Sequence, residues 1–179
     1  MAQRTFNITT AELKNAIPQL DVGNRVYLSG TVYTARDAAH KRIFQLLDAG
    51  AALPFPIENS IVYYAGPTPA KNGMAVGSCG PTTSSRMDAF SPRLLDLGML
   101  AMIGKGDRSQ EVIDAVKRNG AVYLCAVGGA GALIAKCITA AEEIAFQELG
   151  CESVKKLTIS ELPLIVGIDA SGNSIFERN

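Results

Sequence analysis

The sequence predicts a mixed α/β fold, with strands toward both ends of the chain and helices concentrated in the middle. Two observations support this. Residues 26–34 alternate and are rich in β-branched and aromatic side chains, as in a half-buried strand. Between residues 99 and 149, apolar strands, glycine-containing turns and helical patterns follow one another. The chain of 179 residues has the length of about one domain and shows no repeat or linker, so we expect residues 1–179 to form a single domain.

The first half of the chain predicts a strand that leads into a helix. After the strand at residues 26–34, the segment 36–49 carries apolar side chains at the spacing of one helix face, and Gly50 stands where a C-cap glycine is common. Those apolar side chains are Ala39, Ile43, Leu46 and Leu47. Residues 51–80 are rich in proline and glycine, which predicts short strands such as "IVYYAG" separated by turns.

The middle of the chain predicts two capped helices around a buried strand. Ser91 and Pro92 fit the N-cap and the first position of a helix. The run "MLAMIG" then predicts a buried strand. Asp107 fits the N-cap of a helix over residues 108–120, with Gln110 returning the capping bond.

The last third predicts another strand, a turn, a long helix and two final strands. "AVYLCAV" has the apolar character of a strand, "GGAGA" that of a turn, and the residues after it predict a helix that ends at Leu149. "VKKLTIS" and "LPLIVGI" predict the final strands, with a turn at Gly172 and Asn173.

The charge composition argues against partners that are recognised through bulk charge. Lys and Arg number 17 and Asp and Glu also number 17, so the formal net charge is zero. We therefore expect neither a nucleic-acid nor a membrane-surface partner. The first residues lack the apolar core of a signal peptide, and no segment approaches the roughly 20 apolar residues of a membrane span. We expect a cytoplasmic protein.

The cysteines do not predict a metal site. Cys79, Cys125, Cys137 and Cys151 form no C-x-x-C pair, and the chain has one histidine, so a complete metal or cluster site from this chain alone is not expected. Cys125 and Cys137 lie in apolar segments and fit small core positions. Cys79 and Cys151 adjoin glycines and are expected to be more open, and all four are expected to be reduced and without a functional role.

Three glycine-containing stretches follow predicted strands: "CGPTTSSRMD", "GKGDRS" and "GGAGAL". Ligands of α/β proteins collect at such turns, because free backbone N–H groups and helix N-termini point there. "GGAGAL" lacks the third glycine of a dinucleotide fingerprint, and "GKGD" has glycine where a phosphate-binding loop needs Ser or Thr. Both differences argue against a nucleotide ligand.

Arg36, Arg86 and Lys105 each lie at or just after a predicted strand end. All three side chains only donate hydrogen bonds, and a small dicarboxylate would need such a set. The alternative that they are ordinary surface cations stays open. His40, four residues after Arg36 on the same helix face, is taken as a structural group, which is the usual role of a lone histidine.

Four segments together resemble one family. "GPTTSSRMD", "TARDAAHKR", "GKGD" and "GGAGALIAKCI" are similar to segments of the β subunit of the two-subunit class I fumarases and L-tartrate dehydratases, which corresponds to the C-terminal domain of the single-chain enzymes. The resemblance covers nearly the whole chain. It implies a swivelling β/β/α domain, and an enzyme that reversibly hydrates fumarate to L-malate.

The same resemblance implies a division of labour between two chains. In this family, three cysteines of the other subunit hold a 4Fe-4S cluster with one iron open to substrate, and the resemblance implies an α partner and an α2β2 assembly. It assigns substrate binding to Arg36, Arg86 and Lys105, and it implies that Thr82 is the catalytic residue that handles a proton. An alcohol is a poor base unless its alkoxide is stabilised, which Arg86 could do. The alternatives are an L-tartrate dehydratase β subunit and a non-catalytic module that binds small anions.

Overall fold

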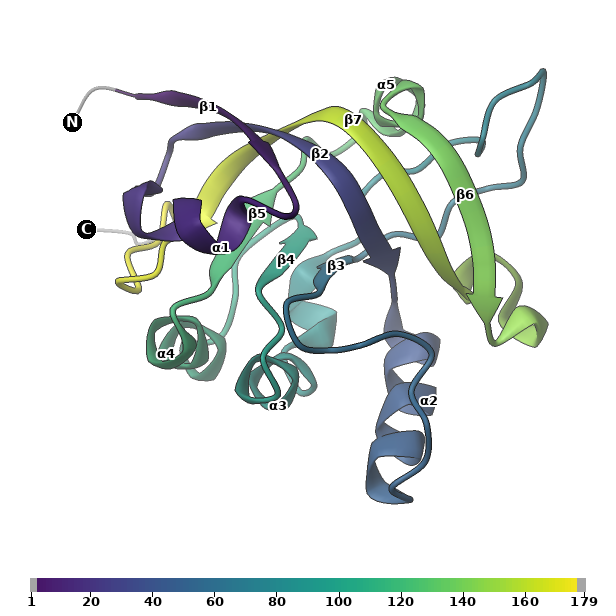
Figure 1. The fold of residues 1–179 in the computed structure, drawn as a ribbon, viewed down its shortest axis with the longest axis horizontal. Coiled ribbons are helices and arrows are strands. Elements are labelled where there is room, and N and C mark those ends of the chain that lie inside the picture. The colour runs from purple at the N-terminus through teal and green to yellow at the C-terminus, as the bar shows by residue number, and fades with distance from the viewer. Residues whose placement is uncertain (1–2, 177–179) are drawn as a thin grey trace.

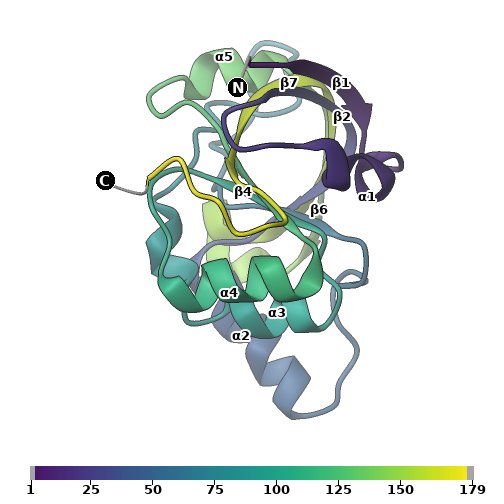
Figure 2. The same ribbon diagram turned by 90° about the vertical axis from the view of Figure 1, so that its left-hand side faces the viewer.

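The computed structural model describes residues 3–176, and the sheet within them has seven strands. Five of these strands close into a ring, because β2 pairs with both β3 and β7. The ring consists of β2 (Arg25–Thr34), β3 (Ile61–Tyr63), β4 (Ala101–Gly104), β5 (Val122–Cys125) and β7 (Val154–Ile168). β2 to β5 are parallel, whereas β7 runs antiparallel to β5 and β2. Figure 2 shows the curved strands around the core of this small barrel.

The two remaining strands extend the ring at its long strands. β1 (Thr5–Thr9) pairs in parallel with the first half of β2. β6 (Ile138–Ala145) pairs antiparallel with the first half of β7 and continues the sheet away from the barrel (Figure 1).

Three helices cover one side of the barrel, and a fourth lies at its other side (Figure 1). The three are α2 (Asp37–Asp48), α3 (Ser91–Asp96) and α4 (Gln110–Asn119), and the fourth is α5 (Gly131–Lys136). The remaining helical segments are α1 (Leu13–Ala16), η1 (Ile17–Gln19), η2 (Ser84–Met87) and η3 (Gln147–Glu152). None of the helices in residues 3–176 is long and apolar enough to cross a membrane.

Alternating side chains of the central strands enter two hydrophobic cores. In β4, Ala101 and Ile103 face the core inside the ring, and Met102 between them faces the core under the helices. In β5, Leu124 belongs to the first core and Tyr123 to the second. Successive side chains of a strand point to opposite faces, so a strand buried on both sides is apolar throughout. This explains the continuous apolar runs that mark these strands in the sequence.

The mixed α/β fold is confirmed, and several elements lie where the sequence predicts them. Both bounds of β2 and both bounds of α2 lie within one residue of the predicted bounds. Gly50 follows α2 with a left-handed φ of 62°. β4 and β5 also lie within their predicted runs.

The predicted long helix that ends at Leu149 is wrong. The helix α5 stops at Lys136, and β6 and η3 follow instead. The sequence of β6 is rich in Ala and Glu, which favour helix. Pairing with β7, which places Glu142 opposite Lys156, overrides this local preference.

Three smaller expectations also differ from the structure. The N-cap of α4 is Ser109 rather than Asp107, whose carboxylate accepts a bond from the Arg108 N–H at 2.7 Å, while Gln110 donates to Asp114. The N-cap of α3 is Phe90, so the predicted capping residue Ser91 is already inside the helix. The two predicted final strands form one continuous strand, β7, and β1 was not predicted from the sequence.

Candidate functional site

The carboxyl ends of the parallel strands β2, β3 and β4 meet at one edge of the sheet, and the candidate residues follow them. β2 ends two residues before Arg36, and β4 ends immediately before Lys105. β3 leads into Tyr64, whose carbonyl accepts a hydrogen bond from the Thr82 N–H at 2.8 Å. Ligand sites of α/β proteins lie at this edge of the sheet.

Arg36 lies at the N-terminus of α2 with its guanidinium beside Gly66. A Cβ atom added to Gly66 would lie 3.2 Å from Arg36 Cδ and 3.3 Å from its Nη1, so the glycine leaves room for the arginine. Glu152 Oε1 is 3.8 Å from Arg36 Nε, which is buried and has no hydrogen-bond partner in the described part of the chain. The side chain is 26% exposed, which leaves part of it open to a ligand.

The segment with Thr82 is hydrogen-bonded to the end of β4. Thr83 forms a parallel bridge with Lys105. Ser84 donates its N–H to the Lys105 carbonyl at 2.9 Å, and its Oγ accepts the Lys105 N–H at 3.0 Å. A side chain on Gly104 would collide with Ser84 Oγ, so this close approach requires glycine at residue 104. The half-buried residues Thr82 and Lys105 are therefore held on neighbouring segments just beyond the strands.

Arg86 is joined to the first turn of α2. Its Nε donates to Asp37 Oδ1 at 2.9 Å, and its side chain is 51% exposed. Asp37 directly follows Arg36, so one carboxylate links the segments that carry the two arginines. The segments that carry the four predicted site residues, Arg36, Thr82, Arg86 and Lys105, thus meet at one edge of the sheet, and three of these residues are cations.

His40 lies beneath this edge and is fully buried. Its Nδ1 is 2.8 Å from the Arg36 carbonyl, so Nδ1 carries the hydrogen and donates it, while Nε2 is buried without a partner in the described part of the chain. The rings of Tyr64 and Phe90 pack against the imidazole. Burial lowers the pKa of His40 to about 4. The neutral ring supports the first turn of α2, as expected of a structural histidine.

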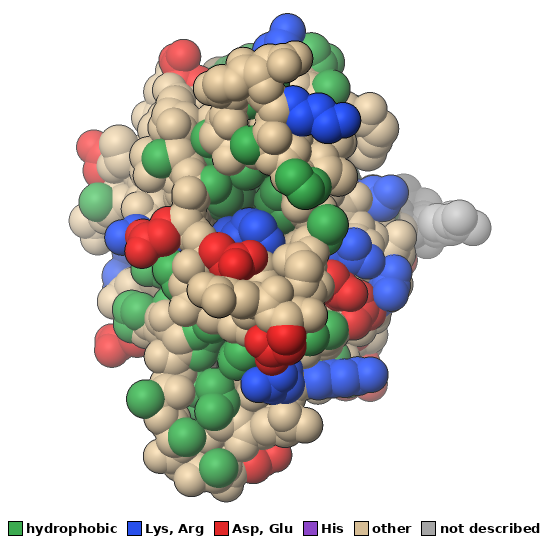
Figure 3. All heavy atoms as spheres, turned by 90° about the vertical axis from the view of Figure 1, so that its right-hand side faces the viewer, with side chains coloured by type: hydrophobic (Ala, Val, Ile, Leu, Met, Phe, Trp, Pro, Cys, Tyr) green, Lys and Arg blue, Asp and Glu red, His purple; other side chains and the backbone are tan. Residues whose placement is uncertain are grey.

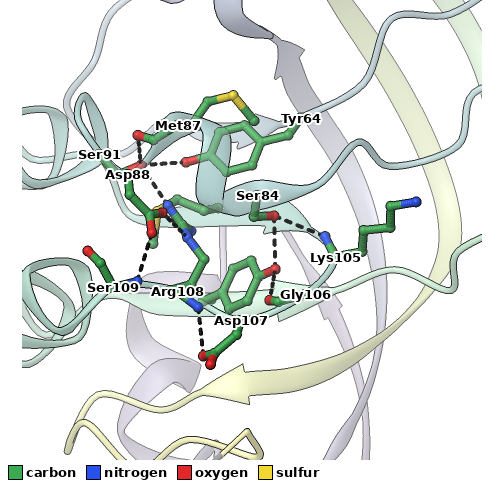
Figure 4. A network of polar contacts seen from close by, with 12 residues as sticks. Tyr64, Ser84, Met87, Asp88, Ser91, Lys105, Gly106, Asp107, Arg108 and Ser109 are labelled. Carbon is green, nitrogen blue, oxygen red and sulfur yellow. Dashed lines mark hydrogen bonds and ion pairs between the residues drawn. The ribbon is translucent and has the colours of Figure 1, made fainter.

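A buried arginine that the sequence reasoning missed joins two parts of the site (Figure 4). Arg108 is fully buried, and its Nε donates to Asp88 Oδ1 at 2.7 Å and its Nη2 to Ser91 Oγ at 2.8 Å. The rings of Tyr64 and Tyr123 lie 5.4 and 4.9 Å from the guanidinium carbon. In the sequence, Arg108 is one more polar residue before a helix, and nothing in its spacing signals that it is buried.

The cysteines do not form a cluster site. Cys79 is fully buried, contrary to the prediction, because it packs in the core inside the ring and its carbonyl accepts the Tyr63 hydroxyl at 2.6 Å. Burial raises its pKa to about 12. Cys151 is exposed, as predicted, and Cys125 and Cys137 are partly buried. Within residues 3–176, no three His, Cys, Asp or Glu side chains are grouped to hold a metal ion, so the described side chains do not fit a 4Fe-4S cluster.

A pocket of about 420 Å³ opens next to Gly66, on the side of the molecule that carries β6. Figure 3 shows this face, which is hollowed near its centre, where hydrophobic side chains lie on one side of a basic side chain and an acidic side chain adjoins it on the other. Lys155 lines the pocket, but its Nζ is 2.6 Å from Ser153 Oγ and 3.8 Å from a Glu143 carboxylate oxygen. This ammonium is therefore already paired within the protein. The lining of the pocket includes Pro67, Thr68, Pro69, Ala75, Val76, Ala141 and Cys151.

Comparison with known proteins identifies relatives over nearly the whole chain. The aerobic class I fumarate hydratase of Salmonella typhimurium is 37% identical over 175 residues, which cover 97% of this chain and 30% of that protein. Fumarate hydratase 2 of Leishmania major is 39% identical over 173 residues, again covering 30% of its length. The chain thus spans about a third of these fumarate hydratases.

A shorter relative matches over most of its own length as well. It is named "Putative L(+)-tartrate dehydratase subunit beta", comes from Methanocaldococcus jannaschii, and is 40% identical over 180 residues, which cover 97% of this chain and 91% of that protein. The family described as Fumarase C-terminus matches residues 1–179. Because that match extends over the entire sequence, the chain belongs to the Fumarase C-terminus family.

Proposed function

We propose that this chain is the β subunit of a cytoplasmic hydro-lyase of the class I fumarase type, which interconverts fumarate and L-malate. The observation that carries the proposal is the convergence of Arg36, Thr82, Arg86 and Lys105 at the carboxyl edge of the parallel strands. Membership of the Fumarase C-terminus family supports the same conclusion.

The three cations would bind the substrate carboxylates. Arg86 uses Nε for Asp37, so its two terminal nitrogens can form parallel bonds to a carboxylate. Lys105 would act as a point charge, and Arg36 would contribute from the N-terminus of α2. Charge that develops on a carboxylate along the reaction path is stabilised by donors already fixed around it.

Thr82 would exchange the proton on carbon. The Thr82 N–H is bonded to the Tyr64 carbonyl, which fixes the backbone that presents its hydroxyl. A hydroxyl becomes an effective base only where nearby cations stabilise its alkoxide. Arg86, one turn further along the same segment, would provide that stabilisation.

The iron-sulfur cluster would belong to a partner. The cysteines of this chain are too scattered to hold a 4Fe-4S cluster. We propose that three cysteines of an α subunit hold it, and that two copies of each chain form an α2β2 assembly. The name of the Methanocaldococcus relative, which designates it a β subunit, supports an arrangement of separate chains.

A second candidate is the β subunit of an L-tartrate dehydratase. The observation that favours it is the match to the Methanocaldococcus relative, which this chain covers to 91%. Tartrate carries one hydroxyl more than malate, and a single polar contact to that group could decide between them. A third candidate is a non-catalytic module that binds small dicarboxylates through the same cations.

Turnover measurements separate the three candidates. The chain is co-expressed with the cluster-bearing chain of the same organism, the complex is purified without oxygen, and L-malate and L-tartrate are supplied separately. We expect fumarate from malate with the complex and none with the isolated chain. Preferred turnover of tartrate would establish the second candidate. Dicarboxylate binding by calorimetry without turnover of either substrate would establish the third and refute the proposal.

A further inference from the structure

We propose that Arg108 is a positioning residue for substrate binding, which acts through Asp88 on Arg86 and through its own segment on Lys105. The proposal rests on the proposed function, because it assigns a role within that site. Arg108 itself is fully buried and does not reach a ligand at the surface.

All three nitrogens of the Arg108 guanidinium have a partner. Nε donates to Asp88 Oδ1 at 2.7 Å, Nη2 to Ser91 Oγ at 2.8 Å, and Nη1 to Met102 Sδ at 3.3 Å. The guanidinium is planar, so three bonds in fixed directions allow it one orientation. A rigid charged group of this kind can hold the segments around it in one arrangement.

Asp88 connects the two segments that carry the proposed binding cations. It lies two residues after Arg86, and its second oxygen, Oδ2, accepts the Ser109 N–H at 2.7 Å. Arg108 and Ser109 follow Lys105 by three and four residues. The Arg108–Asp88 pair therefore joins the Arg86 segment to the Lys105 segment from below (Figure 4).

Residues 84–91, which carry Arg86, form further buried hydrogen bonds on the side that faces the protein interior. Ser91 Oγ donates to the Met87 carbonyl at 2.9 Å, so it accepts both from Arg108 and from the Tyr64 hydroxyl. The Tyr123 hydroxyl lies 2.9 Å from Ser84 Oγ. The inward side of residues 84–91 is thus fixed by buried polar groups.

The outward side of this segment carries Arg86, one of the proposed ligand-binding residues. Arg86 is half exposed, and Asp37 is its hydrogen-bond partner among the described residues. The position of its guanidinium therefore depends on the short helical turn that bears it, and the network of Arg108 fixes that turn. Burying an ion pair is often no gain in stability compared with an apolar core. A geometric role would explain why the chain has one here.

A matched control is available on α4, the helix that begins just after Arg108 and Ser109. Arg118 lies at the far end of α4 from Arg108. Its Nε and Nη2 donate three hydrogen bonds to the Asp96 carboxylate at 2.8 to 3.0 Å, but this pair is about half exposed. A helix of ten residues is about 15 Å long. Arg118→Lys thus repeats the chemical change of Arg108→Lys away from the site.

The test compares Arg108→Lys, Asp88→Asn and Arg118→Lys in the complex with the cluster-bearing chain. Lysine keeps the positive charge but lacks the planar guanidinium with its donors in fixed directions. Asparagine lacks the carboxylate whose Oδ2 accepts the Ser109 N–H. We expect the first two variants to raise KM for malate at least tenfold at parental cluster content, and Arg118→Lys to leave KM unchanged. A purely structural role would reduce the fraction of active enzyme and leave KM of that fraction unchanged, which would overturn the proposal.

Two further arms keep the outcome decisive. If Arg108→Lys does not fold, Asp88→Asn decides by the same KM criterion. If the parental complex has no hydro-lyase activity, the proposed function fails, and the positioning role is tested on the isolated chain by amide hydrogen exchange. Faster exchange at the Thr82 and Ser84 amides in Arg108→Lys than in Arg118→Lys supports it, and equal exchange overturns it.

Discussion

Replacing Arg86 by lysine tests the proposed binding site most directly. In the structure Arg86 offers Nε to Asp37 and keeps two terminal nitrogens for a substrate carboxylate. Lysine has one ammonium group and cannot serve both partners with the same geometry. If the lysine ammonium turns to the substrate, Asp37 Oδ1 loses its hydrogen-bond partner. Within the described part of the chain, Asp37 Oδ2 is buried without a partner, so neither carboxylate oxygen would then be paired.

The expected loss follows from the number of bonds. A hydrogen bond to a charged group contributes about 1.5 to 3 kcal/mol, and Arg86→Lys removes one of two parallel bonds and displaces the other. We therefore expect a loss of about 2 to 4 kcal/mol in transition-state stabilisation, or roughly 30-fold to 1000-fold in kcat/KM.

The assay is steady-state dehydration of L-malate by the purified complex. Arg93→Lys is the control, because Arg93 forms an ion pair with Asp48 on the helical side of the molecule, where both groups are about half exposed or more. Such a surface pair contributes at most about 1 kcal/mol to stability, and we expect parental kcat/KM. If kcat/KM of Arg86→Lys stays within about threefold of the parent, Arg86 does not bind a carboxylate in the transition state.

Three other substitutions give independent predictions. Thr82→Val is nearly isosteric but cannot exchange a proton, so turnover should fall about a hundredfold or more at unchanged cluster content; near-parental turnover would place the base elsewhere. Gly66→Ala puts a Cβ atom 3.0 Å from a backbone carbonyl and 3.2 Å from Arg36 Cδ, so it should displace Arg36 and raise KM; a parental KM would contradict the placement of Arg36. Because burial lowers the pKa of His40 to about 4, the unfolded chain takes up a proton below about pH 6.5 that the folded chain binds only near pH 4. The free energy of unfolding should therefore fall by about 3 kcal/mol as the pH falls through this interval, and His40→Phe should remove that part of the decrease in urea titrations; identical pH dependence in both proteins would refute it.

The sequence predicted those elements whose local pattern agrees with their tertiary environment. β2 alternates because one of its faces packs inside the ring, and α2 is amphipathic because it lies on the surface of the sheet. In β6 the local sequence pattern and the tertiary environment favour different structures. Its side chains are mostly exposed, so it has no apolar face to mark it as a strand, and its composition favours helix. Its hydrogen bonds to β7 decide its conformation, and they involve residues that no local window contains.

The candidate site shows the same limit. Motif resemblance pointed to Arg36, Thr82, Arg86 and Lys105, and the glycines around them correspond to close approaches such as that of Ser84 to Gly104. Arg108 was missed because its burial depends on Asp88 and Ser91, which lie about twenty residues earlier in the chain. Only the folded structure brings these groups within bonding distance.

The closure of the barrel by β7 affects how the chain can fold while the ribosome is still synthesising it. The partners of β2 residues Arg25 and Tyr33 are Ile165 and Lys156. The ribosome must therefore add more than a hundred residues after β2 before its partner strand β7 has been synthesised. Contacts between such distant segments are slow to form. Until translation reaches the last strand, β2 exposes an unpaired edge with apolar side chains, and the nascent chain is vulnerable to aggregation in that interval.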